Sequence, residues 1–90
     1  MDKMKTINRI KEIIGDYTKY DLSQLNSNTA LVEDMGLNSI ELINIVSDIE
    51  DEFDIEIPVD QIVKFHLFFE IEEYVKNVLR TKGESYGIST

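Results

Sequence analysis

The segment SIELINIVSDIEDEF, residues 39–53, places the tightest constraint on the fold. Its apolar side chains recur every three or four residues, which is the spacing of one helix face. Just before it, Asn38 stands three positions ahead of Glu41, a variant of the capping box that predicts a helix start at Ser39. A helix with one apolar face must pack against other elements. The pattern therefore predicts a helical core around Leu42, Ile45, Val46, Ile49 and Phe53.

Three other segments supply packing partners for this helix. Residues 3–15 carry a stripe of Met4, Ile7, Ile10 and Ile14 at helical spacing. Residues 66–80 repeat the pattern with Leu67, Phe68, Ile71, Tyr74, Val75, Val78 and Leu79. The third segment lies between residues 53 and 66. There Pro58 holds Ile57 extended, and Asp60 is expected to cap a short helix that ends at residue 63 or 64. No strand pattern of useful length is present, so we expect an all-α fold, a small bundle of three longer helices and one short helix.

A long loop, residues 16–38, is expected between the first and second helices. Its turn-forming residues lie at 26–29, and the apolar residues expected to anchor it in the core are Leu25, Leu31, Val32 and Leu37. At the other end of the chain, GESYGIST has no helical stripe. We therefore expect one domain over residues 1–82 and a flexible tail over residues 83–90.

Composition excludes several kinds of chemistry. The chain of 90 residues contains no cysteine, which rules out disulfides, thiolate metal sites and a cysteine nucleophile. Its apolar runs fall far short of the roughly 20 residues that span a bilayer, and the first ten residues lack the apolar stretch of a signal peptide. We expect a soluble, cytoplasmic protein without membrane insertion.

Negative charge is concentrated in the middle of the chain. Residues 20–63 hold eleven carboxylates and no Lys or Arg, within a net charge of −9. Such a surface would repel nucleic acid and attract basic protein partners, although an acidic face can also serve solubility alone. The carboxylates do not fit a calcium loop, because a loop starting at Asp48 would need glycine where Phe53 stands. We predict no dedicated metal site.

Ser39 is the residue whose chemistry needs an explanation. A catalytic serine requires a base, and the single histidine, His66, is expected on the polar side of the last helix with Glu70. The surrounding GLNSI is not the G-x-S-x-G nucleophile elbow, so a triad with His66 and Asp34 is disfavoured and we expect no catalytic residue. A serine at a helix start can instead carry a phosphodiester, which the positive end of the helix dipole would stabilise. It can also be a plain helix-start residue.

The segment LVEDMGLNSIELINIVSDIEDEFDIEIP resembles the central segment of acyl carrier proteins. In that family an acidic residue and a glycine precede Asp-Ser-Leu or a close variant, and an acidic helix ending in Glu-Glu-Phe leads to isoleucine and proline. The matching motif here consists of Asp34, Gly36, Leu37, Asn38, Ser39 and Ile40. The likeness extends over about residues 4 to 80. One position departs from the pattern, because Asn38 stands where aspartate is usual.

The resemblance implies a carrier that is not an enzyme. A phosphopantetheinyl transferase would attach 4′-phosphopantetheine from coenzyme A to Ser39, and acyl groups would travel as thioesters on the arm. Acyl-transferring and chain-elongating enzymes with basic docking patches would be its partners, and we expect the carrier to be a monomer. Fatty-acid biosynthesis is the favoured pathway. The alternatives are a specialised carrier for polyketides, nonribosomal peptides or the cell envelope, and an acidic helical adaptor without a prosthetic group.

Two groups of residues complete the expected site. Partners would contact an exposed face of the second helix, formed by Ile40, Glu41, Ile43, Asn44, Ser47, Asp48 and Asp51. An acyl chain would be sheltered by apolar side chains of the second and last helices, namely Leu42, Ile45, Val46, Ile49, Phe68 and Ile71.

Overall fold

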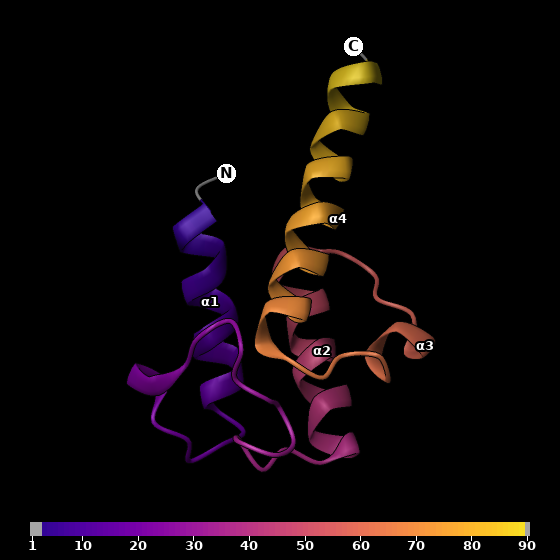
Figure 1. Ribbon diagram of the computed structural model, residues 1–90. Coiled ribbons are helices and arrows are strands. Elements are labelled where there is room, and N and C mark those ends of the chain that lie inside the picture. Colours follow the sequence, from indigo (N-terminus) through magenta and orange to yellow (C-terminus); the bar gives the residue numbers. More distant parts are fainter. Residues whose placement is uncertain (1–2, 90) are drawn as a thin grey trace.

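The computed structural model describes the backbone of residues 3–89 and the side chains of residues 5–81. The chain forms α1 (Lys3–Gly15), the short 3-10 helix η1 (Leu22–Gln24), α2 (Ser39–Phe53), α3 (Val59–Ile62) and α4 (Phe68–Ser89) (Figure 1). Within residues 3–89 the extended pairing is one isolated antiparallel bridge between Ala30 and Leu67. The predicted all-α bundle with one short helix and a long first loop is confirmed.

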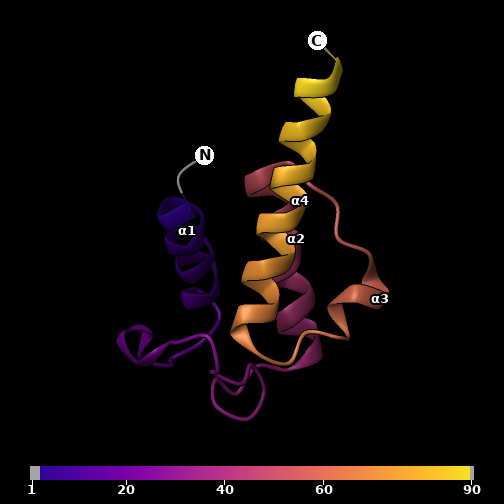
Figure 2. The same ribbon diagram turned by 45° about the horizontal axis from the view of Figure 1, so that its top comes forward.

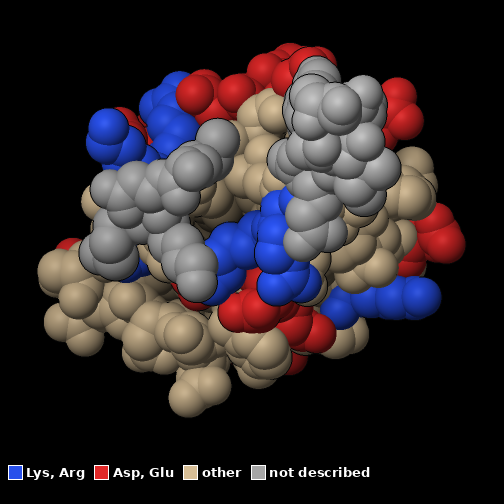
Figure 3. Space-filling model, turned by 90° about the horizontal axis from the view of Figure 1, so that it is seen from above, with Lys and Arg blue, Asp and Glu red and all other residues tan. Residues whose placement is uncertain are grey.

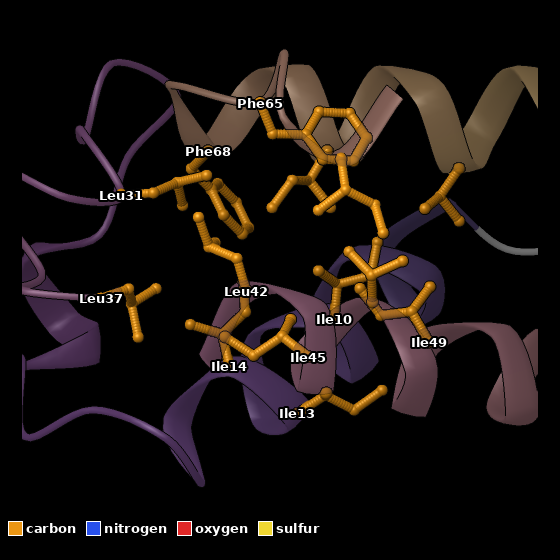
Figure 4. Packing of buried hydrophobic residues seen from close by; sticks show 14 of the residues in the cluster. Ile10, Ile13, Ile14, Leu31, Leu37, Leu42, Ile45, Ile49, Phe65 and Phe68 are labelled. Atoms are coloured by element: carbon orange, nitrogen blue, oxygen red, sulfur yellow. The ribbon is translucent and has the colours of Figure 1, made fainter. Parts of the chain in front are cut away.

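The three longer helices enclose a single apolar core. α1 packs against both α2 and α4, and the small α3 lies to one side beside α2 (Figures 1 and 2). α1 contributes Ile10 and Ile14, both fully buried. Figure 4 shows side chains from the helices and from the long loop meeting in this core. Because buried area is limited in so short a chain, each of these contacts is a sizeable share of the stability.

α2 begins and ends where the sequence predicts. Oδ1 of Asn38 accepts a hydrogen bond from the Glu41 N–H at 2.8 Å, and the Glu41 carboxylate accepts one from the Asn38 N–H at 3.0 Å. This is the expected capping box. The helix ends at Phe53, and the C-cap residue Asp54 adopts the left-handed conformation with φ of 54°.

α3 differs from the prediction at both ends. It begins at Val59, directly after Pro58, which occupies the N-cap position in an extended conformation without a side-chain hydrogen bond. Asp60 therefore lies inside the helix, and its predicted role as the cap is wrong. The physical reason is that proline's fixed φ suits the entry to a helix, so the first turn forms without an acidic cap. The helix also ends earlier than predicted, at Ile62.

α4 begins two residues later than predicted. One carboxylate oxygen of Glu70 accepts hydrogen bonds from the N–H groups of His66 and Leu67, at 2.9 and 2.7 Å. This capping contact fixes the helix start at Phe68 and leaves His66 in the preceding loop, so its predicted place on the last helix is wrong.

The far end of α4 continues past residue 80 to Ser89, beyond the ends of the other helices in Figure 1. The side chains of residues 1–4 and 82–90 are outside the described part. The Met4 packing contact, the boundary at residue 82 and the flexible tail over residues 83–90 therefore stay predictions.

Three hydrogen bonds fix the loop of residues 16–38, one to α2, one within the loop and one to the loop before α4. The Tyr17 hydroxyl donates to Oδ2 of Asp48 at 2.6 Å, and the Thr18 hydroxyl donates to the Met35 carbonyl at 2.9 Å. The Leu31 N–H donates to the His66 carbonyl at 2.9 Å. Of the four predicted core anchors of this loop, Leu25, Leu31 and Leu37 are buried. Val32 is 53% exposed, because the turn that follows Leu31 directs it outward, and its prediction as an anchor is wrong.

Candidate functional site

Ser39 is the first residue of α2 and is exposed to solvent. The turn before it is built by the motif residues. Oδ2 of Asp34 accepts a hydrogen bond from the Ala30 N–H at 2.8 Å, which closes the turn over residues 30–34. Gly36 then takes a φ of 70°, a conformation that a side chain would disfavour, and its predicted place in the motif has a structural reason. The chain re-enters the core at Leu37, which is 2% exposed.

The start of α2 offers unpaired N–H groups to an anion. The capping box satisfies the N–H groups of Asn38 and Glu41. For the N–H groups of Ser39 and Ile40, the described part of the chain provides no acceptor, as expected in the first turn of a helix. These groups and the positive end of the helix dipole suit a phosphodiester on the Ser39 hydroxyl. The site therefore fits a phosphopantetheine group in its exposure and in its unpaired N–H groups.

The arrangement around Ser39 does not form a catalytic triad. Within residues 5–81, no hydrogen bond joins the Ser39 hydroxyl to His66 or to Asp34. The Asp34 carboxylate binds the Ala30 N–H, and the exposed His66 belongs to the loop before α4. Neither side chain is therefore placed by a hydrogen bond to activate this serine, and the absence of catalytic residues stays a prediction.

The predicted partner surface divides into two groups. Ile40 and Ile43 are 71% and 47% exposed, and Asn44, Ser47 and Asp51 are exposed as well. Glu41 and Asp48 are half-buried, and each accepts a hydrogen bond from within the chain, from the Asn38 N–H and the Tyr17 hydroxyl respectively.

The division of this surface follows from its position on α2. Asp48 and Glu52 lie on the edge of α2 that faces α1, where Glu52 also pairs with Arg9 at 2.9 Å. The free face is centred on Ile40, Asn44 and Ser47.

Two features of this region escaped the sequence reasoning. Tyr17 positions Asp48, but a tyrosine just after a helix does not predict a hydrogen bond to a residue thirty-one positions away. Val59 and Val63 are 68% and 70% exposed at the two ends of α3. The sequence could have predicted the exposure of these valines, because a helix of only four residues can bury few side chains.

The six residues predicted to shelter an acyl chain lie together, but as packed core. Leu42 is 7% exposed and the others at most 1%, and they are Ile45, Val46, Ile49, Phe68 and Ile71. An open groove of about 490 Å³ lies elsewhere, between the residues just after α2 and the middle of α4. Its lining residues are Asp54, Ile55, Tyr74, Asn77, Val78 and Thr81, and it includes none of the six. Their role as a chain lining stays a prediction.

The described part of the chain shows neither a metal site nor a membrane-spanning helix. Among the described residues, no group of three or more His, Cys, Asp or Glu side chains is placed to hold a metal ion. No helix in the same part of the chain is long and apolar enough to cross a membrane.

Comparisons with known proteins agree with this geometry. Residues 8–67, which include Ser39, match the sequence model of a family described as "Phosphopantetheine attachment site". The chain is 31% identical over 77 residues to an acyl carrier protein of Lactobacillus acidophilus, covering 86% of this chain and 96% of that protein. It is 26% identical over 68 residues to an acyl carrier protein of Clostridium acetobutylicum, covering 76% and 88%.

The fold has a counterpart among solved structures. An acyl carrier protein from Enterococcus faecalis, described for its high thermal stability, superposes with a TM-score of 0.75 at 20% identity. The superposition covers 87% of this chain and 99% of that one, which establishes the likeness of fold. Together with the family match over residues 8–67 and the 31% identity above, it leads to one conclusion. The chain belongs to the acyl carrier protein family, whose members bear a covalently attached 4′-phosphopantetheine group.

Proposed function

We propose that Ser39 carries the 4′-phosphopantetheine arm. The observation that carries this proposal is the exposed Ser39 hydroxyl at the first position of a capped helix, inside the matched residues 8–67. In the transfer, Oγ of Ser39 attacks the phosphorus of coenzyme A that bears the pantetheine. A new P–O bond forms, the pyrophosphate bond breaks, and adenosine 3′,5′-bisphosphate leaves. The hydroxyl proton passes to the transferase, so the chain itself needs no base.

The attached arm would make the chain a carrier of acyl groups and not a catalyst. Its terminal thiol supplies the sulfur that this cysteine-free sequence lacks, and acyl groups are held there as thioesters. Tethering raises the effective concentration of the intermediate at each enzyme it visits. We place this carrier in fatty-acid biosynthesis, as the acyl carrier proteins similar to it suggest. A specialised carrier pathway is the second candidate, favoured by Asn38 in place of the usual aspartate.

The partners follow from the arm and from the exposed face of α2. A phosphopantetheinyl transferase must approach Ser39, and acyl-transferring and chain-elongating enzymes must receive the arm. Ile40 and Ile43 form a small apolar patch beside it, and Asp51 adds charge. We infer that these enzymes present an apolar contact with basic residues around it. We place the carrier in the cytoplasm, where coenzyme A is available to the transferase. We expect it to act as a monomer.

Mass spectrometry tests the attachment directly. The purified chain is incubated with coenzyme A and a broad-specificity transferase, and its mass should rise by one phosphopantetheine group. Ser39→Ala should abolish the gain. Ser27→Ala is the matched control, because it removes an exposed serine of the long loop, away from the face of α2 that partners contact, and should leave modification intact. An unchanged mass with several transferases would favour the adaptor without a prosthetic group.

A further inference from the structure

Lysine is missing from the part of the chain that surrounds Ser39. Residues 20–63 contain none, and they include the turn before Ser39, all of α2 and all of α3. The absence matters because a neutral lysine amine is a nucleophile, and it converts a thioester into a stable amide. The first lysines on either side of this stretch are Lys19 and Lys64, and Lys64 belongs to the segment that leads into α4.

The Lys64 side chain is available for reaction. The residue follows α3, is exposed, and is held by its backbone, whose N–H donates to the Gln61 carbonyl at 3.0 Å. Within residues 5–81, its ammonium group forms no hydrogen bond or ion pair. Lys76, in contrast, pairs with Glu73 at 3.2 Å. The Lys64 amine is therefore an unpaired group on a flexible stem.

Backbone hydrogen bonds bring Lys64 near the loop that presents Ser39. The Leu37 N–H donates to the Leu31 carbonyl at 3.1 Å, and the Leu31 N–H donates to the His66 carbonyl at 2.9 Å. Ser39 lies two residues after Leu37, and Lys64 lies two residues before His66. With about 3.5 Å per extended residue and about 6 Å across each hydrogen-bonded pair, the Cα atoms of Ser39 and Lys64 are separated by about 26 Å at most.

This limit is comparable with the reach of the arm. Phosphopantetheine has about as many chain bonds as five extended residues, or about 17 Å, and a lysine side chain adds about 6 Å. A path that changes direction at each hydrogen bond also spans less than the limit. Figures 1 and 2 show the segment between α3 and α4 toward the same end of the bundle as the start of α2, whereas the first turn of α1, which carries Lys5, lies toward the opposite end.

We propose that Lys64 is an autoacylation site, whose amine takes the acyl group from the arm when no enzyme collects it. The proposal rests on attachment of the arm at Ser39. The neutral Lys64 nitrogen attacks the thioester carbonyl, a C–N bond forms and the C–S bond breaks. The electron pair of the broken bond leaves with the sulfur, which takes up the proton released by the amine. The products are an N-acyl-lysine and a free thiol, and nothing is oxidised or reduced.

The proposal gives the lysine-free stretch a role beyond its charge. Tethering holds the thioester at a high effective concentration near every group within reach of Ser39. A lysine on the exposed face of α2 would meet the thioester far more often than Lys64 does. Exclusion of lysine from residues 20–63 removes these faster acceptors, so the acyl group stays on the arm long enough to reach an enzyme.

Peptide mass spectrometry tests the proposal on the full chain. The arm is loaded as acetyl-phosphopantetheine from acetyl-coenzyme A. Failure to load at Ser39 would overturn the proposed function and this proposal with it, and that result is read by mass before any lysine is analysed. The loaded chain is then kept at mildly alkaline pH, where a larger share of lysine amines is neutral. Acetylation of Lys64 should exceed that of Lys5, an exposed lysine beyond the reach of the arm, by about tenfold or more.

Variants separate transfer within one chain from background chemistry. Lys64→Arg keeps the charge and removes the nucleophile, so its thioester should outlast that of wild type. Asn44→Lys adds an amine on the exposed face of α2 and should lose its thioester faster, with the acetyl group recovered at position 44. When the loaded chain is mixed with an isotopically heavy Ser39→Ala chain, only the light chain should be acetylated at Lys64. Equal acetylation of Lys64 and Lys5, equal acetylation of the light and heavy chains, or complete loss of the thioester without acetylated Lys64 would each overturn the proposal.

Discussion

The Tyr17 hydroxyl donates a 2.6 Å hydrogen bond to Oδ2 of Asp48 and so connects the loop just after α1 to the middle of α2. Close by, Arg9 of α1 donates a 2.9 Å hydrogen bond to the Glu52 carboxylate of α2. Carboxylates on this edge of α2 therefore serve the fold as well as the surface. An acidic stretch of sequence is not equivalent to an acidic docking face, because part of its charge is directed at groups within the chain.

Tyr17→Phe should lower the urea midpoint at neutral pH, because it removes the bond to Asp48. The same bond raises the pKa of Tyr17 above its ordinary value, with burial adding to the effect. A raised pKa means that the stability from this group is fully present below the unfolded pKa, about 10, and is lost as pH rises through the folded pKa. The advantage of wild type over Tyr17→Phe should therefore shrink at alkaline pH.

Glu72 is a carboxylate buried on α4, 9% exposed, where it is within electrostatic reach of Lys11 on α1. Burial raises its pKa, while Lys76 and Lys11 act in the opposite direction and Glu73 adds to the rise. Because the pKa of Glu72 is higher in the folded state, its protonated form favours folding at pH values below the unfolded pKa. This stabilisation is lost as pH rises through the folded pKa. Glu72→Gln should therefore be more stable than wild type at neutral pH and lose that advantage near pH 4, where about half of an unfolded glutamate is protonated. Urea titrations at the two pH values measure this, and a destabilised Glu72→Gln at neutral pH would show that the lysines dominate.

Gly36→Ala isolates the backbone requirement of the turn before Ser39. Gly36 has a φ of 70°, and a Cβ atom added there would meet no atom within 4 Å. The cost should come from conformation alone, about 1–2 kcal/mol in the free energy of unfolding. Gly36→Asn should cost less, because asparagine tolerates left-handed conformations. Chemical denaturation measures both losses, and equal stability of all three proteins would show that the turn can rearrange.

The sequence predicted α2 within a residue because two independent signals coincide there. The apolar stripe sets its buried face and the Asn38–Glu41 capping box sets its start, and both are local. The exposure of Ser39 and Ile40 and the burial of Leu42 follow from the same periodicity. The family motif added the chemistry, which no property of an isolated helix start could supply.

The errors arose where contacts outside the helical periodicity decide the outcome. The start of α4 depends on a hydrogen bond from the His66 N–H to the Glu70 carboxylate. The spacing of apolar residues carries no information on such a bond. The half-buried state of Asp48 depends on Tyr17, far away in the chain. The helical wheel placed Asp48 on the polar side of α2 correctly, but it carried no information on where α1 would lie.

Asn38 should matter to transferases more than to the fold. Asn38→Ala removes the side chain that caps α2 and should cost about 1 kcal/mol of stability. Asn38→Asp keeps the cap and adds a charge next to Ser39. It should leave stability nearly unchanged and raise the rate of modification by a fatty-acid-type transferase, because charge complementarity speeds encounter. Rates are followed by mass spectrometry. Equal rates for wild type and Asn38→Asp would remove the argument that this position selects the transferase.

The exposed face of α2 should bind its partners through a combination of contact and charge. Ile40 is 71% exposed, so Ile40→Ala should leave the fold intact and weaken transferase binding by about 1 kcal/mol or more, to a similar degree at every salt concentration. Asp51 is exposed, and no contact within the described residues involves its carboxylate, which makes it a cleaner probe of charge than Glu41 or Asp48.

Asp51→Lys should therefore slow association strongly at low salt and mildly at high salt, because the Debye length is about 10 Å at 0.1 M. Asp51→Asn, which only removes the charge, should fall between Asp51→Lys and wild type. Stopped-flow association rates with the transferase, measured across ionic strength, separate the two effects. If Asp51→Lys associates as fast as wild type at low salt, this carboxylate does not steer the encounter, and docking on α2 depends on Ile40 and its apolar neighbour Ile43.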